Sequence, residues 1–294
     1  MNLYIIGNGF DLNLGLNTSY QDFYLFLLKN HSEFLKSIAD VFIADNITDP
    51  LWSRFEEELS CVNFAFFTVP YEYYDSGRIL HKESTMNISK KILIWKEYLS
   101  MYFHEWISHT YKKPELRKER FNADDYFINF NYTSTLEDCF NVQAKQIYYI
   151  HGIANDCNSE LIFGHGLSED ITKLCSDAQI LNDGYINCTL EELNDLVAMN
   201  MVLYVLRKPV ERLLKDLDNI KCNINKINNI FVLGHSIGKV DMPYFQWIRD
   251  KVNSKAKWFF SYYSENDFKH IKSITKQLNI LEYKCENINQ LIGL

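Results

Sequence analysis

Short apolar runs alternate along the chain with longer segments in which apolar residues recur every three or four positions. Polar or glycine-containing turns bound the short runs, and runs of this kind predict buried strands. Five strands are expected, at residues 3–6, 126–130, 147–150, 229–233 and 257–262. Strands separated by helical segments are typical of a parallel sheet covered by helices. The pattern therefore predicts an α/β fold with a Rossmann-like parallel sheet flanked by helices.

Helical periodicity is clearest over residues 88–111, where Ile92, Trp95 and Leu99 follow three- and four-residue spacing. Helices are also expected at 22–29, at 52–67, after His165 (with Thr189 and Glu192 in capping-box spacing) and from Pro209 to residue 217. More than a hundred residues separate the first two strands, far more than one crossover helix needs. We therefore expect one domain over residues 1–294, with helical insertions at about 30–122 and 169–220.

Composition narrows the class of protein. The chain has 294 residues and a formal net charge of -8, which argues against a protein that binds nucleic acid through its phosphates. Its seven cysteines form no CxxC pair, so a reducing compartment, the cytoplasm, is expected, and no metal cluster is predicted. The N-terminus lacks the features of a secretion signal, and no apolar run reaches the roughly 20 residues that span a bilayer.

The first predicted strand leads directly into Gly7-Asn8-Gly9-Phe10-Asp11. Glycines after a strand allow backbone amides to approach a phosphate group, so a nucleotide is the first ligand to consider. The dinucleotide fingerprint has a third glycine where this chain has Leu12. The alternative is a tight turn from strand to helix in which Asp11 caps the helix.

Polar residues also follow the second and third predicted strands. Asn129, Asn131 and Thr133 could hold a ribose hydroxyl or a water molecule, or could form an Asx or ST turn that leads into a helix at Ser134. His151 could act as a general base near neutral pH, or could be a hydrogen-bonded structural residue. Because ligands of open α/β sheets bind at the carboxyl ends of strands, these residues define the expected site.

The fourth predicted strand ends in Gly234-His235-Ser236-Ile237-Gly238, which fits the nucleophile elbow of α/β-hydrolases. The acid and histidine that such an enzyme needs are poorly placed, since Asp267 and His270 are too close in sequence to come from separate strand ends. Pro243 would also fall in the second turn of the elbow helix, at a cost of about 3 kcal/mol. We interpret residues 234–241 as a binding loop in which Ser236 donates a hydrogen bond, with Asp241 capping a helix that has Pro243 in its first turn.

Four segments taken together resemble the AbiH family of bacterial abortive-infection proteins. They are GNGFD (7–11), NFNYTST (129–135), YIHG (149–152) and GHSIGKVD (234–241). The resemblance extends to Tyr244-Phe245 and includes the acidic segment at 51–56. It implies a role in defence against phage.

The same order of motifs is similar, more distantly, to the sirtuin-like NAD-binding domain. That similarity implies Gly7 and Gly9 at the pyrophosphate, Asn131 beside the nicotinamide ribose, His151 as the catalytic histidine and Ser236 as the late serine. The other residues expected to line the NAD site are Asn8, Phe10, Asn129, Thr133, Gly234, His235 and Asp241. The chain has Thr133 where sirtuins carry an acid, and it lacks the four-cysteine zinc module of the deacetylases.

These features together predict an abortive-infection effector that binds NAD as its substrate and hydrolyses the nicotinamide–ribose bond, without a metal. Asn131 would orient water or ribose, His151 would accept a proton, and Asp11 would face the developing positive charge. Because an unregulated hydrolase of this kind would kill its host, a phage-derived trigger and a homo-oligomer are expected partners. The alternatives are a module that senses a nucleotide or phage protein without catalysis, and a nuclease.

Overall fold

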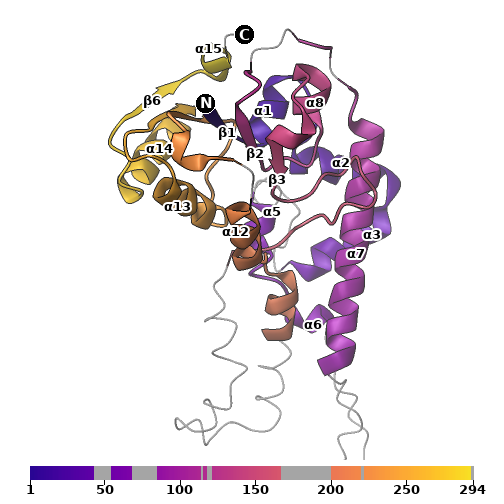
Figure 1. Cartoon of the computed structure of the whole chain (residues 1–294). Helices are drawn as coiled ribbons and strands as arrows, with labels where there is room; N and C mark the ends of the chain where they lie inside the picture. The colour runs from indigo at the N-terminus through magenta and orange to yellow at the C-terminus, as the bar shows by residue number, and fades with distance from the viewer. Residues whose placement is uncertain are drawn as a thin grey trace, which may run out of the picture. The chain divides into compact units, whose positions relative to one another are not determined.

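The sheet contains six parallel strands in the order β3-β2-β1-β4-β5-β6 (Figure 1). The computed structural model describes residues 1–42, 54–67, 85–113, 115–117, 121–166, 200–219 and 222–292. The strands are β1 (Asn2–Ile6), β2 (Tyr126–Asn129), β3 (Ile147–Tyr149), β4 (Asn229–Leu233), β5 (Lys257–Ser261) and β6 (Tyr283–Glu286). The strand order reverses between β1 and β4, as in Rossmann folds. The predicted α/β fold with a Rossmann-like parallel sheet is confirmed.

Both faces of the sheet are covered by helices, because successive side chains of a strand point to opposite faces. Leu3 and Ile5 belong to one buried cluster, together with residues of α12 (Val210–Asp218), α13 (Met242–Lys251) and α14 (Glu265–Gln277). Tyr4 and Ile6 belong to a second cluster, with residues of α1 (Asn8–Asn13), α8 (Thr135–Phe140) and α15 (Ile288–Ile292). Burial on both faces explains why β1 appears as a continuous apolar run.

Stacked aromatic rings cross the second face from strand to strand. Tyr4 stacks on Phe127 of β2 at 5.0 Å between ring centroids and on Phe231 of β4 at 4.9 Å, and Phe231 stacks on Phe259 of β5 at 4.8 Å. The stacked residues are register partners in neighbouring strands. Cross-strand aromatic pairs stabilise one register of a sheet, so this row helps to align the ends of four strands.

The remaining helices confirm part of the predicted pattern. They are α2 (Tyr20–Asn30), α3 (Ser32–Val41), α5 (Phe55–Glu58), α6 (Phe64–Phe67), α7 (Thr85–Thr110), residues 200–206, and the 3-10 helices η1 (Ala144–Gln146) and η2 (Ile224–Lys226). α7 confirms the helix expected at 88–111, and α12 the helix expected after Pro209. The single helix expected at 52–67 is wrong, since Val62, between α5 and α6, pairs with Phe42 in an antiparallel bridge. The stretch with Thr189 and Glu192 lies outside the described residues.

The sequence pattern did not reveal β6. Its residues, Tyr-Lys-Cys-Glu, are partly or fully exposed, as is common for a strand at the edge of a sheet. An edge strand needs no continuous apolar run, so the pattern that revealed the inner strands is missing here. β6 matters for the site because the turn after it lies at the same edge of the sheet as the loops after β1 and β4.

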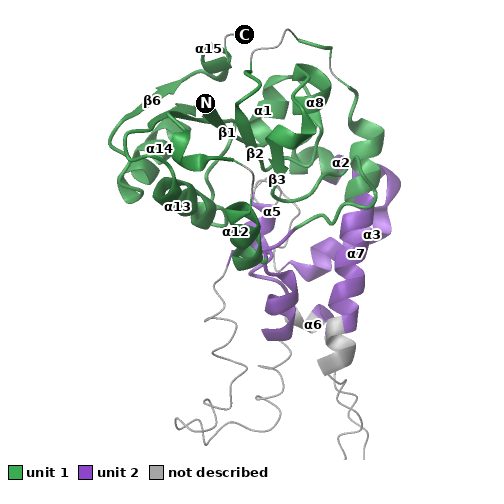
Figure 2. Cartoon of the chain, in the orientation of Figure 1, with its two compact units in different colours: residues 1–23, 103–162, 209–294 green, residues 24–102, 163–208 purple. Residues whose placement is uncertain are grey.

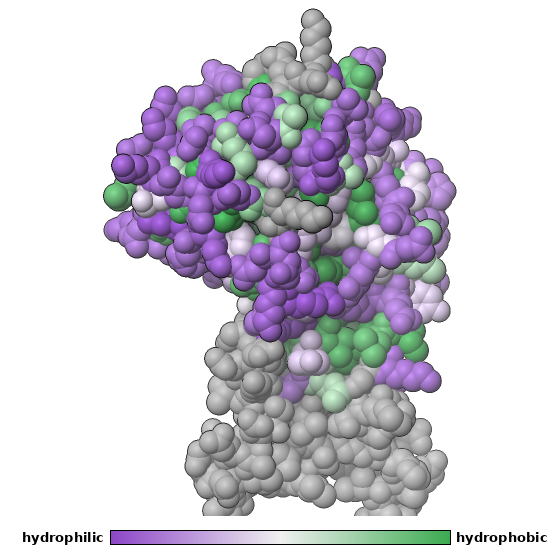
Figure 3. Space-filling model, viewed as in Figure 1, coloured by the Kyte–Doolittle hydropathy of each residue, from purple (hydrophilic) through white to green (hydrophobic). Residues whose placement is uncertain are grey.

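The chain groups into two compact units (Figure 2). The first comprises residues 1–23, 103–162 and 209–294 and holds all six strands; the second comprises residues 24–102 and 163–208. In the second unit, Lys208 is fully buried, and its Nζ lies 2.7 Å from Oε2 of Glu56. Burial also lowers the pKa of His165 to about 4. The described residues on the face shown in Figure 3 are mostly hydrophilic. The expected single domain with insertions stays a prediction.

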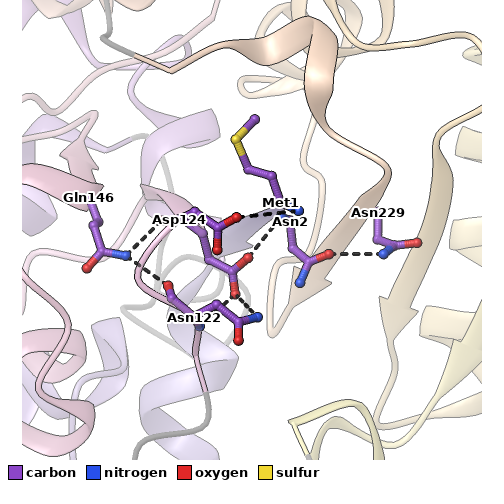
Figure 4. Close-up of polar contacts among 7 residues, drawn as sticks. Met1, Asn2, Asn122, Asp124, Gln146 and Asn229 are labelled. Atoms are coloured by element: carbon purple, nitrogen blue, oxygen red, sulfur yellow. Dashed lines mark hydrogen bonds and ion pairs between the residues drawn. The ribbon is translucent and has the colours of Figure 1, made fainter.

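A polar network closes the amino edge of the sheet (Figure 4). The buried carboxylate of Asp125 accepts hydrogen bonds on both oxygens, from the backbone N–H of Asn2 at 2.9 Å and from that of Asn122 at 3.0 Å. The Gln146 side chain donates to the carbonyls of Asn122 and Asp125 at 3.1 and 2.9 Å, and Asn229 donates to the Asn2 side chain at 3.0 Å. These hydrogen bonds therefore join β1, the turn before β2, and β4 at the amino edge of the sheet.

Candidate functional site

The loops after four strands meet at the carboxyl edge of the sheet. Ile6 pairs with Asn129 in β2 and with Leu233 in β4, and Asn129 pairs with Tyr149 in β3, so the four strands end at one level. The residues that follow them are those predicted from the sequence, and several are in contact. Asn131 Nδ2 donates to the Gly7 carbonyl at 3.1 Å, linking the loops after β2 and β1.

The two glycines of the first loop lie against the loop after β4. Gly7 N–H donates to the Leu233 carbonyl at 2.9 Å, and Gly9 N–H donates to the Gly234 carbonyl at 2.8 Å. A Cβ at Gly7 would lie 2.6 Å from His235 Cα, and one at Gly9 would lie 2.8 Å from the Gly234 oxygen. These glycines thus allow two backbones to touch, and their contact with a pyrophosphate stays a prediction. The sequence motif alone could not distinguish glycines that pack against another backbone from glycines that contact a phosphate.

The other two residues of this loop have side chains engaged within the protein. Asn8 accepts a hydrogen bond from the Thr18 hydroxyl at 2.8 Å. The Phe10 ring is buried in the second core cluster, with its centroid 5.5 Å from that of Phe140. Their contact with a cofactor is untested.

Asp11 is fully buried and does not cap α1, because the helix begins at Asn8 after Gly7. Its Oδ2 accepts a hydrogen bond from the Thr133 hydroxyl at 2.5 Å. Burial raises the pKa of Asp11 from its ordinary value of 3.8 to about 6, although hydrogen bonds from Thr133, Thr135 and Asn131 lower it. A buried carboxyl with a pKa near neutrality is a common feature of functional sites.

The loop after β2 contains the predicted Asx turn, since the Asn131 backbone N–H donates to Asn129 Oδ1 at 3.0 Å. Two buried side-chain oxygens in this region nevertheless have no hydrogen-bond partner among the described residues. Oδ1 of Asp11 and Oδ1 of Asn131 are buried and accept no hydrogen bond within normal geometry from the residues that the structure describes. Buried acceptors of this kind are rare in folded proteins and usually bind an ordered water or a ligand hydroxyl.

His151 follows β3 and lies among aromatic rings. Its side chain is buried, with ring centroids 5.3 Å from Phe130, 6.0 Å from Tyr132 and 6.3 Å from Tyr244. The chain turns sharply after it at Gly152, whose φ is +84° and where a Cβ would lie 2.1 Å from the Glu160 carbonyl oxygen. Only glycine fits this turn, and the turn fixes the position of His151.

Phe130 also links His151 to the loop after β4, because its ring lies edge-on to His235 at 4.4 Å between centroids. His235 Nδ1 accepts the Ile237 N–H at 2.9 Å, so the ring proton of the neutral imidazole lies on Nε2. That nitrogen faces Asp241, whose Oδ2 is 3.7 Å away. His235 and Asp241 thus form a second pair of ionisable groups, beside Asp11 and His151.

The hydrolase alternative has no support in the loop that carries Ser236. α13 begins at Met242 with Pro243 in its first turn, as predicted, although the Asp241 side chain makes no capping hydrogen bond. Asp267 Oδ2 accepts the Ser264 N–H at 2.9 Å in the capping box of α14. His270 Nε2 lies 3.1 Å from the Ile237 carbonyl oxygen. The acid and the histidine that would serve Ser236 therefore have structural partners.

A pocket of about 550 Å³ opens beside these loops, on the side of β4, β5 and β6. Its lining residues come from the ends of β1, β4, β5 and β6 and from α14: Gly9, Leu12, Asn13, Gly234, His235, Ser236, Ser261, Tyr262, Tyr263, Asp267, His270, Ile271, Asn287 and Ile288. Gly9, Gly234, His235 and Ser236 were predicted from the sequence. Asp267 and His270 were considered only as partners of Ser236. Ser261, Tyr262 and Tyr263 were missed because the end of β5 carried no recognisable motif, and Asn287 and Ile288 because β6 was not predicted.

The described part of the chain contains neither a cluster of metal ligands nor a helix that could cross a membrane. No group of three or more His, Cys, Asp or Glu side chains there is arranged to hold a metal ion. None of the helices in these ranges has the length and apolar character required to cross a membrane.

Comparison with known proteins agrees with the motifs. A sequence model of the family described as bacteriophage abortive infection AbiH matches residues 3–262. No curated protein and no solved structure gave a match. The matched region includes the loops after β1, β2, β3 and β4, and it covers most of the 294 residues. The chain therefore belongs to the AbiH family, and its role lies in bacteriophage abortive infection.

Proposed function

We propose that the chain binds NAD across the carboxyl edge of the sheet and hydrolyses its nicotinamide–ribose bond during abortive infection. The observation that carries the proposal is the pair of unsatisfied buried acceptors, Oδ1 of Asp11 and Oδ1 of Asn131. They lie at the strand-order reversal between β1 and β4 or next to it, where dinucleotides bind in Rossmann folds. Ribose hydroxyls and water are the donors that such acceptors would bind.

The reaction converts NAD and water into ADP-ribose, nicotinamide and a proton. The C–N bond to the ribose breaks, and its electron pair leaves with nicotinamide as a neutral ring. Asn131 Oδ1 would accept a hydrogen bond from the attacking water or the ribose. His151 would take the proton that water loses, a contribution of typically about 10² to 10⁴-fold. The carboxylate of Asp11 would stabilise the positive charge that develops on the ribose.

The similarity to sirtuins supports this assignment at one further position. Thr133 occupies the place where sirtuins carry an acid, and its hydroxyl donates to the carboxylate of Asp11. A carboxylate is therefore present beside that position, although it comes from the loop after β1. Without a zinc module for peptide binding, water is the acceptor of the ADP-ribosyl group in this proposal.

The test is nicotinamide release by the purified protein, together with total NAD in phage-infected cells. The His151→Ala and Asn131→Ala variants should lose release by at least about 100-fold. His109→Ala is the matched control, because His109 is exposed on α7 and its Nδ1 lies 2.8 Å from the Glu105 carbonyl oxygen of the same helix. Equal release by all four proteins would contradict the proposal.

One observation favours a second function, a nucleotide sensor without catalysis. The pocket of about 550 Å³ is not lined by Asp11, Asn131 or His151, so a nucleotide bound in it need not meet the proposed catalytic side chains. Binding of intact NAD without nicotinamide release would favour the sensor. Cleavage of nucleic acid that requires added divalent metal would instead favour the nuclease alternative.

A further inference from the structure

The pocket beside the catalytic cluster combines an aromatic wall, aliphatic walls and neutral polar groups. Tyr262 and Tyr263 follow β5, Ile271 and Ile288 come from α14 and α15, and Asn287 follows β6. A volume of about 550 Å³ is within the range of small-molecule sites. The pocket reaches the cluster through His235, which lines it and also contacts Phe130. His235 therefore lies between the pocket and the Phe130 ring, which in turn contacts His151.

Tyr263 has the geometry of a stacking platform. Its side chain is 97% exposed, and no ring contact is resolved for it among the described residues. Its backbone is nevertheless held in place, because its N–H donates to Asp267 Oδ2 at 3.2 Å beside the capping box of α14. An aromatic ring that faces solvent from an anchored backbone can stack on a base with little loss of conformational entropy.

The charge of the pocket favours a ligand without a phosphate at this end. The described residues that line it include no lysine or arginine, two histidines (His235 and His270) and one carboxylate, Asp267. A phosphate group on the ribose would meet no lysine or arginine among them and would lie near a negative charge, a repulsive arrangement that gives specificity.

Much of this wall belongs to the C-terminal part of the chain. The AbiH match ends at residue 262, whereas Tyr263, Asp267, His270, Ile271, Asn287 and Ile288 follow it. Much of the chemistry of the pocket therefore comes from residues outside the region that matches the family.

We propose that this pocket holds the adenosine half of the substrate, with adenine stacked on Tyr263, and that it selects NAD over NADP because the 2′-phosphate of NADP would meet the Asp267 carboxylate and no lysine or arginine among the described lining residues. The inference rests on the proposed NAD function, and it makes the C-terminal wall of the pocket responsible for choosing the cofactor.

The test uses two probes that lack nicotinamide, ADP-ribose and ADP-ribose 2′-phosphate, with affinity measured by calorimetry on the full chain. ADP-ribose should bind at least tenfold more tightly than its 2′-phosphate. Tyr263→Ala should weaken ADP-ribose binding by about 5- to 150-fold, the range expected for one base stacked on one ring. Tyr204→Ala removes another exposed tyrosine, outside the pocket, and should leave the affinity unchanged.

A second pair of variants tests the charge. Asp267→Asn keeps an oxygen that can accept the Ser264 N–H but removes the negative charge, so the preference for ADP-ribose should shrink. Glu265→Gln removes a neighbouring carboxylate of α14 that does not line the pocket, and it should leave the preference intact.

The outcomes separate this inference from the proposed hydrolysis. Equal affinity for the two probes, or an unchanged affinity in Tyr263→Ala, would overturn the inference even if nicotinamide is released. Selective binding that depends on Tyr263, without nicotinamide release from NAD, would support the inference and overturn the hydrolase.

Discussion

The two edges of the sheet each bury a carboxylate, and the two carboxylates differ in their partners. Asp125 at the amino edge and Asp11 at the carboxyl edge are both fully buried. Asp125 accepts hydrogen bonds of normal geometry on both oxygens, whereas Asp11 accepts one of normal geometry, from Thr133 on Oδ2, and none on Oδ1 from the described residues. Burial alone therefore does not mark a functional site in this protein. The proposed function rests instead on the missing hydrogen-bond partner of Asp11, and the following changes test that distinction.

The largest effect is expected from Gly7→Ala, because the new Cβ would lie within 2.7 Å of two backbone atoms in the loop after β4. Neither backbone can move without breaking the hydrogen bonds that join the loops, so stability should fall by about 4 kcal/mol and nicotinamide release should be lost. Urea unfolding measures the first effect. Gly15→Ala is the control: Gly15 has a φ of +81° and nothing within 4 Å of its Cβ position, so only about 1 kcal/mol is expected. Similar losses in both variants would refute the role of the contact.

Asn131→Ala should separate activity from stability. It removes one of the two unsatisfied acceptors, so nicotinamide release should fall by about 10² to 10⁴-fold. The melting temperature should change little, because the lost hydrogen bond to Gly7 is offset by removal of an unpaired buried oxygen. A melting temperature that falls steeply while the release rate per folded molecule is unchanged would assign Asn131 to the structure alone.

Asp11→Asn should stabilise the protein near neutral pH. Burial raises the pKa of Asp11 from 3.8 to about 6, so between these values the folded protein holds a proton that the unfolded chain has lost. Stability therefore falls as pH rises through this window, and above it the charged carboxylate costs up to about 3 kcal/mol. Thermal unfolding should show Asn stabilising at pH 7.5, with a much smaller gain at pH 4. The same gain at both pH values would show that the charge of Asp11 is not responsible.

Asp125→Asn should destabilise the protein, the opposite of Asp11→Asn, and should have the smallest effect on activity. The amide nitrogen of Asn would face an N–H donor of Asn2 or Asn122, leaving that donor unpaired, at a cost of about 1–3 kcal/mol. Nicotinamide release per folded molecule should stay at the wild-type level. A variant that is fully stable but inactive would reverse the contrast between the two edges.

The grouping of the candidate site residues at the carboxyl edge could be predicted because each of them lies next to a recognisable strand in the sequence. Asn131, His151 and His235 each follow a strongly apolar strand, and parallel strands place their carboxyl ends together, so the cluster could be expected before its geometry was known. No sequence pattern predicted the polar network at the amino edge. Asp125 and Gln146 are distant from Asn2 along the chain, and the network forms only through tertiary hydrogen bonds.

Other features depended on contacts that no local pattern encodes. The burial of Asp11 follows from the packing of α1 against α8, so the sequence suggested a helix cap instead. Asn287 in the pocket wall was missed because β6 is an edge strand with a half-exposed pattern, and Tyr263 was missed because the end of β5 carries no recognisable motif. The glycines of the first loop were recognised, yet their partner proved to be the backbone at Gly234.

The contact of Gly7 and Gly9 with Gly234 also bears on how a lethal enzyme would be kept silent before infection. The two loops touch backbone to backbone and are joined by hydrogen bonds, so no side chain can act as a latch between them. A resting state that depended on pulling these loops apart would have to break the centre of the sheet. Control of the proposed activity is therefore expected where the nucleotide enters, because the carboxyl edge of the sheet is already assembled.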